Sequence, residues 1–394
     1  MTPALQASNT PEKQLLVLCT RTRIGPETAA EIGQILAGPL DWGYLISESL
    51  ENSVTPLFYR QLRSVAWGLV PVERQDKLNT IAKSLAVRAM FLTAELLRLL
   101  DLFEAQGIRA IPYKGPVLAA QAYGDFALRE FEGLDLILRQ RDMPAANEVV
   151  LGLGYKPKFD WIFSEAAAAT LVPGEYNYRD VARNAMIELH TEKTLRHFPV
   201  APDIETFLQR LVPVRIAERD VMTFAPEELL TMLCIHGSKD FWERLSWIAD
   251  VSELTQSRAN FDWSRAWGFA DALKAGRMVR LGLALSVALF ATPLPQEVIA
   301  TIRADVTASD LAESVARRLV QQPFHTLNGA GRFNFRRKMQ AGAAAGWRYA
   351  TRLAVVPAEE DWEMVRLPPA LAPLYVALRP IRLLRKYGWG SRKD

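Results

Sequence analysis

Two apolar stretches of the chain each contain one carboxylate. Asp135 lies in GLDLIL, residues 133–138, and Glu188 lies in IELH, residues 187–190. Side chains alternate between the two faces of a strand, so each carboxylate shares a face with every second residue. Carboxylates on the same face of adjacent strands suit Mg²⁺, and two such ions can clamp the attacking and leaving oxygens of a phosphoryl transfer. We therefore predict that Asp135 and Glu188 bind metal and carry the chemistry.

Position 133 shares its strand face with Asp135, but it is a glycine and supplies no ligand. Glu132 points to the opposite face of a regular strand. Glu130 lies three residues from position 133, about 10 Å away at ~3.3 Å per residue. A bulge at Gly133 would re-aim Glu132, since glycine in a strand often marks one. Three interpretations stay open: a weakened or inactive centre, rescue by Glu132 or Glu130, or a substitution in an otherwise active protein.

Lys114 and Gly115 follow a β-branched, apolar run and precede a predicted helix. Unpaired N–H groups and the positive end of the helix dipole attract anions there, so we predict a phosphate-binding turn. The alternative is a simple turn between strand and helix. Arg129 offers a planar fork of N–H donors that suits a triphosphate. A surface ion pair with Glu130 or Asp125 explains it equally well.

Two histidines and a lysine are candidate auxiliary residues. His190 follows Glu188 on the same strand face, where it would touch a metal, orient the carboxylate or carry a proton. A structural histidine is the alternative. His236 and Lys239 share a polar helix face with Asp240 and Glu243, because these residues recur at helical spacing. A solvated helix face is one interpretation, and a substrate-facing role for His236 and Lys239 is the other.

The composition is that of an ordinary globular protein. The chain has 394 residues, of which 49% are hydrophobic and 23% charged, and a net charge of +3 that gives no reason to expect specific nucleic-acid binding. Two cysteines, Cys19 and Cys234, cannot form a disulfide framework, so we expect a reducing cytoplasm. The N-terminus lacks the pattern of a secretory signal. The longest uncharged apolar stretch, residues 281–295, is too short to span a bilayer and predicts a buried helix.

Apolar periodicity predicts mainly helices, with a small α/β region between them. The longest predicted helix covers residues 72–105. The α/β region comprises a strand at 108–113, a helix at 116–123, a strand at 134–139, a helix at 142–153 and a hairpin-like pair over 175–192. Further helices are predicted at 203–211, 226–256, 262–274, 276–291, 295–303, 308–320 and 371–387.

These elements predict five regions in chain order. They are a disordered N-terminus (1–12), a helical region (13–107), an α/β core (108–195), a second helical region (196–326) and a Gly/Ala- and Arg-rich segment with a terminal basic helix (327–394). The basic tail from Arg379 to Lys393 carries interleaved apolar residues, so contact with an anionic membrane surface is one interpretation. We favour packing of this helix on its own chain.

Several of these motifs together resemble the uncharacterised nucleotidyltransferase family of the polymerase-beta-type superfamily. The resemblance covers roughly residues 40 to 388, and it rests on Lys114-Gly115, Arg129, residues 134–138, Glu188-Leu189-His190, His236-Gly237, residues 242–245, residues 247–250, Leu374-Tyr375 and Arg379-Pro380.

The resemblance implies an α+β fold: a small mixed-sheet nucleotidyltransferase core flanked by N- and C-terminal helical regions, predominantly helical overall. It also implies an Asp-x-Asp pair on one strand and a third carboxylate on a neighbouring strand. By matching positions, Asp135 is the second carboxylate and Glu188 the third. Gly133 stands where the first aspartate belongs.

Two functional hypotheses follow from the residues and the resemblance together. The first is a nucleotidyltransferase that uses Mg²⁺ or Mn²⁺ to transfer a nucleoside monophosphate from an NTP to an unidentified small-molecule or peptide acceptor. Gly133 would impair this activity. The second is a catalytically silent nucleotide-binding protein that acts as a regulator or scaffold.

Overall fold

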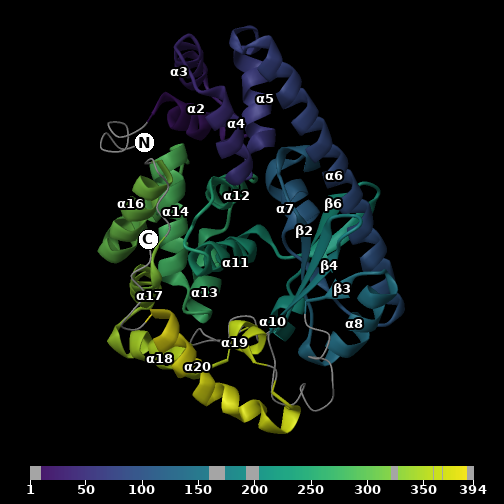
Figure 1. Ribbon diagram of the computed structural model, residues 1–394. Coiled ribbons are helices and arrows are strands. Elements are labelled where there is room, and N and C mark those ends of the chain that lie inside the picture. The colour runs from purple at the N-terminus through teal and green to yellow at the C-terminus, as the bar shows by residue number, and fades with distance from the viewer. Residues whose placement is uncertain are drawn as a thin grey trace. The chain divides into compact units, whose positions relative to one another are not determined.

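The computed structural model describes residues 10–158, 174–191, 204–320, 327–357, 359–365 and 367–387 (Figure 1). The described chain forms two compact units, each built from segments that are not consecutive. The first unit contains residues 1–97, 112–132 and 210–327, and the second contains residues 98–111, 133–209 and 328–394. The predicted regions follow chain order instead, so their boundaries stay a prediction. The N-terminal disorder predicted for residues 1–9 lies outside the described residues, whereas Pro11 and Glu12 already belong to a helix.

The first unit is mainly helical. Its elements are α2 (Pro11–Cys19), α3 (Pro26–Leu36), α4 (Trp42–Glu51), α5 (Thr55–Val65), the turn η1 (Trp67–Leu69), most of α6 (Val72–Ala105), α7 (Gly115–Leu118), η2 (Ala119–Tyr123), η3 (Phe126–Leu128), the hairpin β6 (Val212–Ile216) and β7 (Arg219–Thr223), α11 (Pro226–Lys239), α12 (Leu245–Gln256), α13 (Trp263–Ala272), α14 (Gly276–Phe290), α15 (Gln296–Ala304) and α16 (Val306–Val320).

Several helices begin where the sequence provides a capping side chain. Asp41 accepts a hydrogen bond from the backbone N–H of Tyr44 at the start of α4, and Asp262 accepts one from Arg265 at the start of α13. Such caps satisfy backbone donors that have no partner within the helix. Helix α14 is the buried helix that the apolar stretch predicts, and it packs against α11, α12 and α16. No helix within the described parts of the chain is both long and apolar enough to cross a membrane.

The single helix predicted over 226–256 is wrong, because the chain breaks between α11 and α12. Phe241 and Trp242 adopt φ values of 61° and 54°, which end the helical path. The break buries Trp242 completely, against Gly237 of α11 and Gly282 of α14. A Cβ at Gly237 would lie 2.6 Å from the Trp242 ring, so only glycine permits this packing. Glu243 lies beyond α11, so the predicted polar stripe does not continue to it.

The second unit contains the mixed sheet, except for Pro112 at the end of β1. Five strands lie in the order β1-β2-β5-β4-β3: β1 (Ile111–Pro112), β2 (Gly133–Ile137), β5 (Ala185–His190), β4 (Glu175–Asp180) and β3 (Lys156–Pro157). Strands β2 and β5 pair in parallel, whereas β4 runs antiparallel to both β5 and β3. The hairpin-like pair predicted over 175–192 is therefore confirmed as β4 and β5 within the described residues. The predicted strand at 108–113 shortens to β1.

One face of the sheet forms the core of this unit. Leu134 and Leu136 of β2 alternate with more accessible residues, and so do Ile187 and Leu189 of β5, which are fully buried. Helix α8 (Met143–Gly152), preceded by the turn η4 (Gln140–Asp142), is tied to the sheet by a hydrogen bond from the Tyr178 hydroxyl to Asn147. The apolar residues of β2 and β5 thus fix the direction in which the alternate side chains point.

The remaining helices of the second unit are α10 (Ile204–Leu208), α17 (Gly329–Lys338), α18 (Ala343–Val355), α19 (Glu359–Met364), the turn η6 (Pro369–Leu374) and α20 (Tyr375–Tyr387). Asp361 of α19 is fully buried and pairs with Arg379 at 2.9 Å and with Arg382, both on α20. Two cations of the basic tail therefore bind the chain itself. The rest of the tail, residues 388–394, lies outside the described residues. The α+β fold, predominantly helical with a small mixed sheet, is confirmed.

Candidate functional site

Asp135 and Glu188 lie side by side in the sheet. They are direct partners in the parallel pairing of β2 with β5, between the pairs Leu134–Ile187 and Leu136–Leu189. Because paired residues of neighbouring strands point to the same face, both carboxylates leave the sheet opposite its leucine and isoleucine core. Both are partly accessible, with exposed side-chain fractions of 14% and 24%. The sheet therefore presents two acidic groups together on its more open face.

His190 completes a cluster with these carboxylates. Its Nε2 lies 3.5 Å from Asp135 Oδ1 and 3.7 Å from Glu188 Oε2, and the imidazole is nearly buried. One potential ligand atom from each of the three residues lies within 4.8 Å of the other two. An octahedral ion with bonds of about 2.1 Å holds neighbouring ligands about 3 Å apart and opposite ligands about 4.2 Å apart. The cluster fits one divalent cation after small side-chain adjustments.

Gly133 occupies the position two residues before Asp135, opposite Met186 of β5. A Cβ built there would lie 3.0 Å from the Met186 carbonyl oxygen and 3.2 Å from its Cβ. Any side chain at position 133 therefore requires β2 and β5 to separate by a few tenths of an ångström. The close approach of the two strands at this position therefore suits a residue without a Cβ.

Lys114 and His236 are brought together within the first unit. Gly115 has a φ of 54°, a conformation that favours glycine, and Lys114 immediately before it is buried. Lys114 Nζ lies 3.4 Å from His236 Nδ1, which also lies 3.3 Å from Asp240 Oδ2. A single Nδ1 accepts from the ammonium when it is unprotonated and donates to the carboxylate when it is protonated. Whether Nδ1 carries a proton, which depends on the tautomer of the ring, decides which of these two partners it binds.

Arg129 does not form the surface ion pair with Glu130 or Asp125 that we considered. Its Nε and Nη2 donate to the two oxygens of Asp250, at 2.7 Å and 2.8 Å. The Tyr123 hydroxyl donates to the same carboxylate at 2.8 Å. Both members of the ion pair are nearly buried. One edge of the guanidinium is therefore committed to Asp250.

The uncharacterised nucleotidyltransferase family matches residues 38–291, which is more than half of the 394 residues. The chain belongs to this family. The match includes both the strand carboxylates and the Lys114–His236 pair, and it ends before α15, so the likeness proposed for the tail lies beyond it. No curated protein matches the chain.

A solved structure offers a weaker comparison for this nucleotidyltransferase family member. The chain is similar to an antigenic nucleotidyltransferase-like protein from Paracoccidioides brasiliensis, with 12% sequence identity and a TM-score of 0.31. The similarity covers 57% of this chain and 92% of that chain. At this TM-score, the likeness adds nothing to the family assignment.

Neither glutamate proposed as a substitute ligand joins the carboxylate cluster of this family member. The register of β2 is regular from Gly133 to Ile137, so the predicted bulge is absent from these five residues. Among the described residues, the side chains spaced closely enough to hold one metal ion with Asp135 are Glu188 and His190. Glu132 instead uses its carbonyl oxygen to accept a hydrogen bond from Arg88.

Sequence reasoning missed two features of the first unit. Spacing gives no sign that Asp250 is the partner of Arg129, because 121 residues separate them. The raised pKa of Glu130 is the second feature that its sequence context does not reveal. Burial, reinforced by the neighbouring Glu132 carboxylate, raises the pKa of Glu130 to about 7. Its Oε2 is buried without a hydrogen-bond partner among the described residues.

Lys239 is the last residue of α11, and its substrate-facing role stays a prediction.

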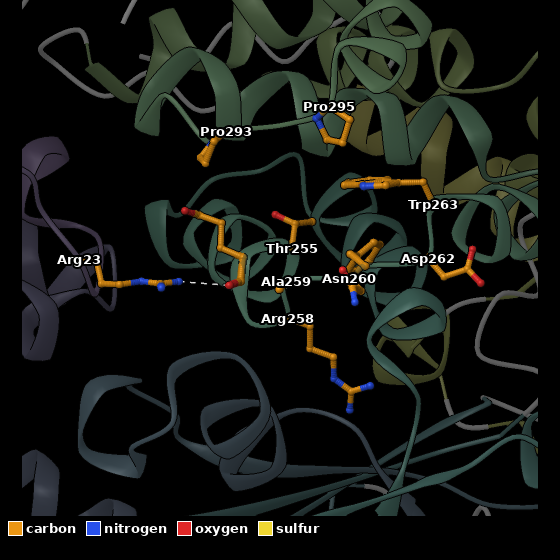
Figure 2. A pocket seen from close by; sticks show the side chains of 11 residues that line it. Arg23, Thr255, Arg258, Ala259, Asn260, Asp262, Trp263, Pro293 and Pro295 are labelled. Carbon is orange, nitrogen blue, oxygen red and sulfur yellow. Dashed lines mark hydrogen bonds between the residues drawn. The ribbon is translucent and has the colours of Figure 1, made fainter.

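An open pocket of about 660 Å³ lies elsewhere in the first unit (Figure 2). Trp263, Pro293 and Pro295 line one side of it, and Arg23 reaches in from another side to donate to the Gln256 carbonyl oxygen. None of the predicted site residues lines this pocket. We therefore do not assign it to the nucleotidyltransferase chemistry.

Proposed function

We propose that this protein is a metal-dependent nucleotidyltransferase that transfers a nucleoside monophosphate from an NTP to a small-molecule or peptide acceptor. One observation carries the proposal: Asp135 and Glu188 are direct neighbours across β2 and β5, with His190 beside both. In the reaction, an acceptor oxygen bonds to the α-phosphorus, pyrophosphate leaves, and the acceptor loses its proton.

The donor set of the cluster favours Mg²⁺ or Mn²⁺. Two carboxylates provide the oxygen ligands that both ions prefer, and the imidazole of His190 makes Mn²⁺ the better fit of the two. A bound ion would supply charge neutralisation for the phosphate oxygens. Asp135 and Glu188 would hold it, and His190 would act either as a third ligand or as the group that orients the two carboxylates.

Phosphate binding is assigned to Lys114 and Gly115. Lys114 supplies an ammonium close to His236, and Gly115 adopts a left-handed conformation that lets the backbone approach a ligand. The role predicted for Arg129 requires either opening of its pair with Asp250 or approach of the ligand to the other edge of the guanidinium. Lys114 is therefore a stronger candidate than Arg129 for contact with the phosphates.

Cytoplasmic location stays a prediction from cysteine usage, and both cysteines are buried and free.

Calorimetric titration with Mn²⁺ tests the metal site directly. We expect the parent protein to bind Mn²⁺, and Asp135→Asn and Glu188→Gln each to weaken binding tenfold or more, since each removes a charged ligand. Asp180→Asn is the matched control, because Asp180 lies in the same sheet, at the end of β4, and pairs with Arg183 instead. Equal Mn²⁺ affinity in all four proteins would exclude the cluster as a metal site.

Titration with the four NTPs in the presence of Mg²⁺ tests the donor. We expect one or more NTPs to bind, with affinity that falls when Mg²⁺ is withheld, and pyrophosphate to be released when the acceptor is present. Absence of binding by all four NTPs would overturn the assignment of a nucleotide substrate.

The close approach of β2 and β5 at Gly133 favours a second candidate function. Gly133 has no side chain and so supplies no first carboxylate of an Asp-x-Asp pair, and the nearby Met186 crowds any Cβ at this position. We propose, as the alternative, a catalytically silent protein that binds a nucleotide as a regulator or scaffold. NTP binding that does not depend on Mg²⁺ and releases no pyrophosphate would favour this alternative over the enzyme.

A further inference from the structure

A second open groove of the first unit lies between α5, α6 and the turn η3. It has a volume of about 630 Å³, within the size range of small-molecule sites. Three cations line it: Arg60 and Arg63 from α5, and Lys83 from α6. None of the residues assigned to nucleotidyl transfer lines this groove. It therefore requires its own explanation.

Arg63 is held in place by aromatic and polar neighbours. Its guanidinium carbon lies 5.7 Å from the centre of the Tyr59 ring and 5.9 Å from that of Trp67, and the two rings meet edge to face. Arg63 Nη1 donates to the Tyr59 hydroxyl at 3.0 Å, and that hydroxyl donates to Asn79 Oδ1 at 2.7 Å. This chain of contacts fixes the guanidinium before any ligand arrives, which reduces the entropy cost of binding.

The other two cations have no counterion among the described residues. Arg60 and Lys83 are exposed, and neither forms an ion pair or hydrogen bond with the residues that the structure describes. Asp125 is the acidic residue of the groove lining, and its Oδ1 already accepts a hydrogen bond from the backbone N–H of Ala127 at 2.9 Å. Three positive charges against one negative charge leave a net charge of +2 in one concave surface. Such a surface attracts anions.

Most of the remaining lining residues are apolar. Ala82 and Ala86 come from α6, Pro56 from α5 and Leu128 from η3. A free inorganic anion would leave this apolar surface uncovered, whereas a ligand with an apolar or planar body would bury it. The combination of cations with an apolar lining therefore selects an amphiphilic anion.

We propose that this groove binds a small organic phosphate: Arg60, Arg63 and Lys83 hold the phosphate group, and the apolar lining receives the organic body. Arg63 contributes a preorganised planar fork, and the other two cations contribute charge. The site is independent of the proposed nucleotidyl transfer, because the lining contains none of its residues.

Calorimetric titration with 1-naphthyl phosphate tests the proposal. EDTA is present throughout, so that a divalent metal at Asp135 and Glu188 cannot mediate binding. We expect one molecule to bind the parent protein. Arg60→Ala and Lys83→Ala should each weaken binding about tenfold or more, since each removes a charge-assisted hydrogen bond to the phosphate group. Both residues are exposed and have no partner within the described part of the chain, so the variants should fold normally.

Lys77→Ala is the matched control, because Lys77 is an exposed lysine on the same helix that does not line the groove. It should bind 1-naphthyl phosphate as tightly as the parent. The proposal fails if the parent does not bind this ester, or if Arg60→Ala and Lys83→Ala bind it as tightly as Lys77→Ala does.

Two further probes separate the contributions of the phosphate and the organic body. 1-Naphthol lacks the phosphate and should not bind measurably, and inorganic phosphate lacks the body and should bind at least tenfold more weakly than the ester. Binding of inorganic phosphate as tight as that of the ester would overturn the assignment of an organic ligand. Binding of 1-naphthol as tight as that of the ester would overturn the role of the cations.

Discussion

The carboxylate of Asp250 receives three hydrogen bonds, two from the guanidinium of Arg129 and one from the hydroxyl of Tyr123. All three groups are nearly buried. Burial raises the pKa of Tyr123, and the negative charge of Asp250 raises it further, so the tyrosine stays a donor at neutral pH. This triad joins η2 and the segment after η3 to helix α12 inside the first unit.

Replacement of Asp250 by asparagine should destabilise the protein strongly. The substitution leaves the Arg129 guanidinium buried without its counterion, and breaking a buried pair in this way costs about 3 to 5 kcal/mol. Urea unfolding would measure the loss. Asp220→Asn is the comparison, since Asp220 pairs with Arg215 on an exposed hairpin and should change stability by less than about 1 kcal/mol. Equal effects of the two substitutions would show that the buried pair is not a structural support.

Glu130 should make stability depend on pH between about pH 4.5 and 7. Its folded-state pKa, about 7, lies above that of an unfolded glutamate, so the folded protein binds more protons in this range. Stability is therefore favoured at low pH and falls as pH rises through 7. Glu130→Gln should remove this dependence and become more stable than the parent at pH 8, by roughly 2 kcal/mol.

Thermal or urea unfolding at several pH values between 4.5 and 8 would measure the effect of Glu130→Gln. Glu218→Gln is the control, because Glu218 is exposed in the turn between β6 and β7. If the difference between Glu130→Gln and the parent stays constant across this pH range, the buried carboxyl does not titrate there.

Gly133→Ala should destabilise the sheet by about 1 to 2 kcal/mol, because the added methyl overpacks the contact between β2 and β5 at Met186. Gly152→Ala, at the end of α8 with nothing near its Cβ position, should be neutral or slightly stabilising. The difference between the free energies of unfolding of the two variants separates the cost of crowding at position 133 from the general effect of replacing a glycine. A neutral Gly133→Ala would show that the strands separate easily there, and Gly133→Asp would then be the variant with which to restore a first carboxylate.

The sequence predicts those parts of the fold that depend on local periodicity. Helix α6 begins and ends at the predicted residues, 72 and 105, because its apolar residues recur at helical spacing over the whole length. The position of Asp135 and Glu188 on the same face of adjacent strands was also predicted, since apolar residues flank each carboxylate and fix the face on which it lies.

Features that depend on distant or unusual contacts were not predictable in this way. The break at Phe241 and Trp242 places two aromatic residues in left-handed conformations, which no local propensity favours, and its stabilisation comes from glycines on two different helices. The hairpin of β6 and β7 was missed, because its short strands give a weak signal. The partner of Arg129 lies far away along the chain, where spacing carries no information.

The two compact units are encoded by alternating stretches of the chain, 1–97, 112–132 and 210–327 for one and 98–111, 133–209 and 328–394 for the other. No continuous fragment of the gene therefore specifies either unit. A recombination event that replaced one uninterrupted stretch could not exchange a whole unit alone, so the carboxylate sheet and the helical unit would be inherited as a set.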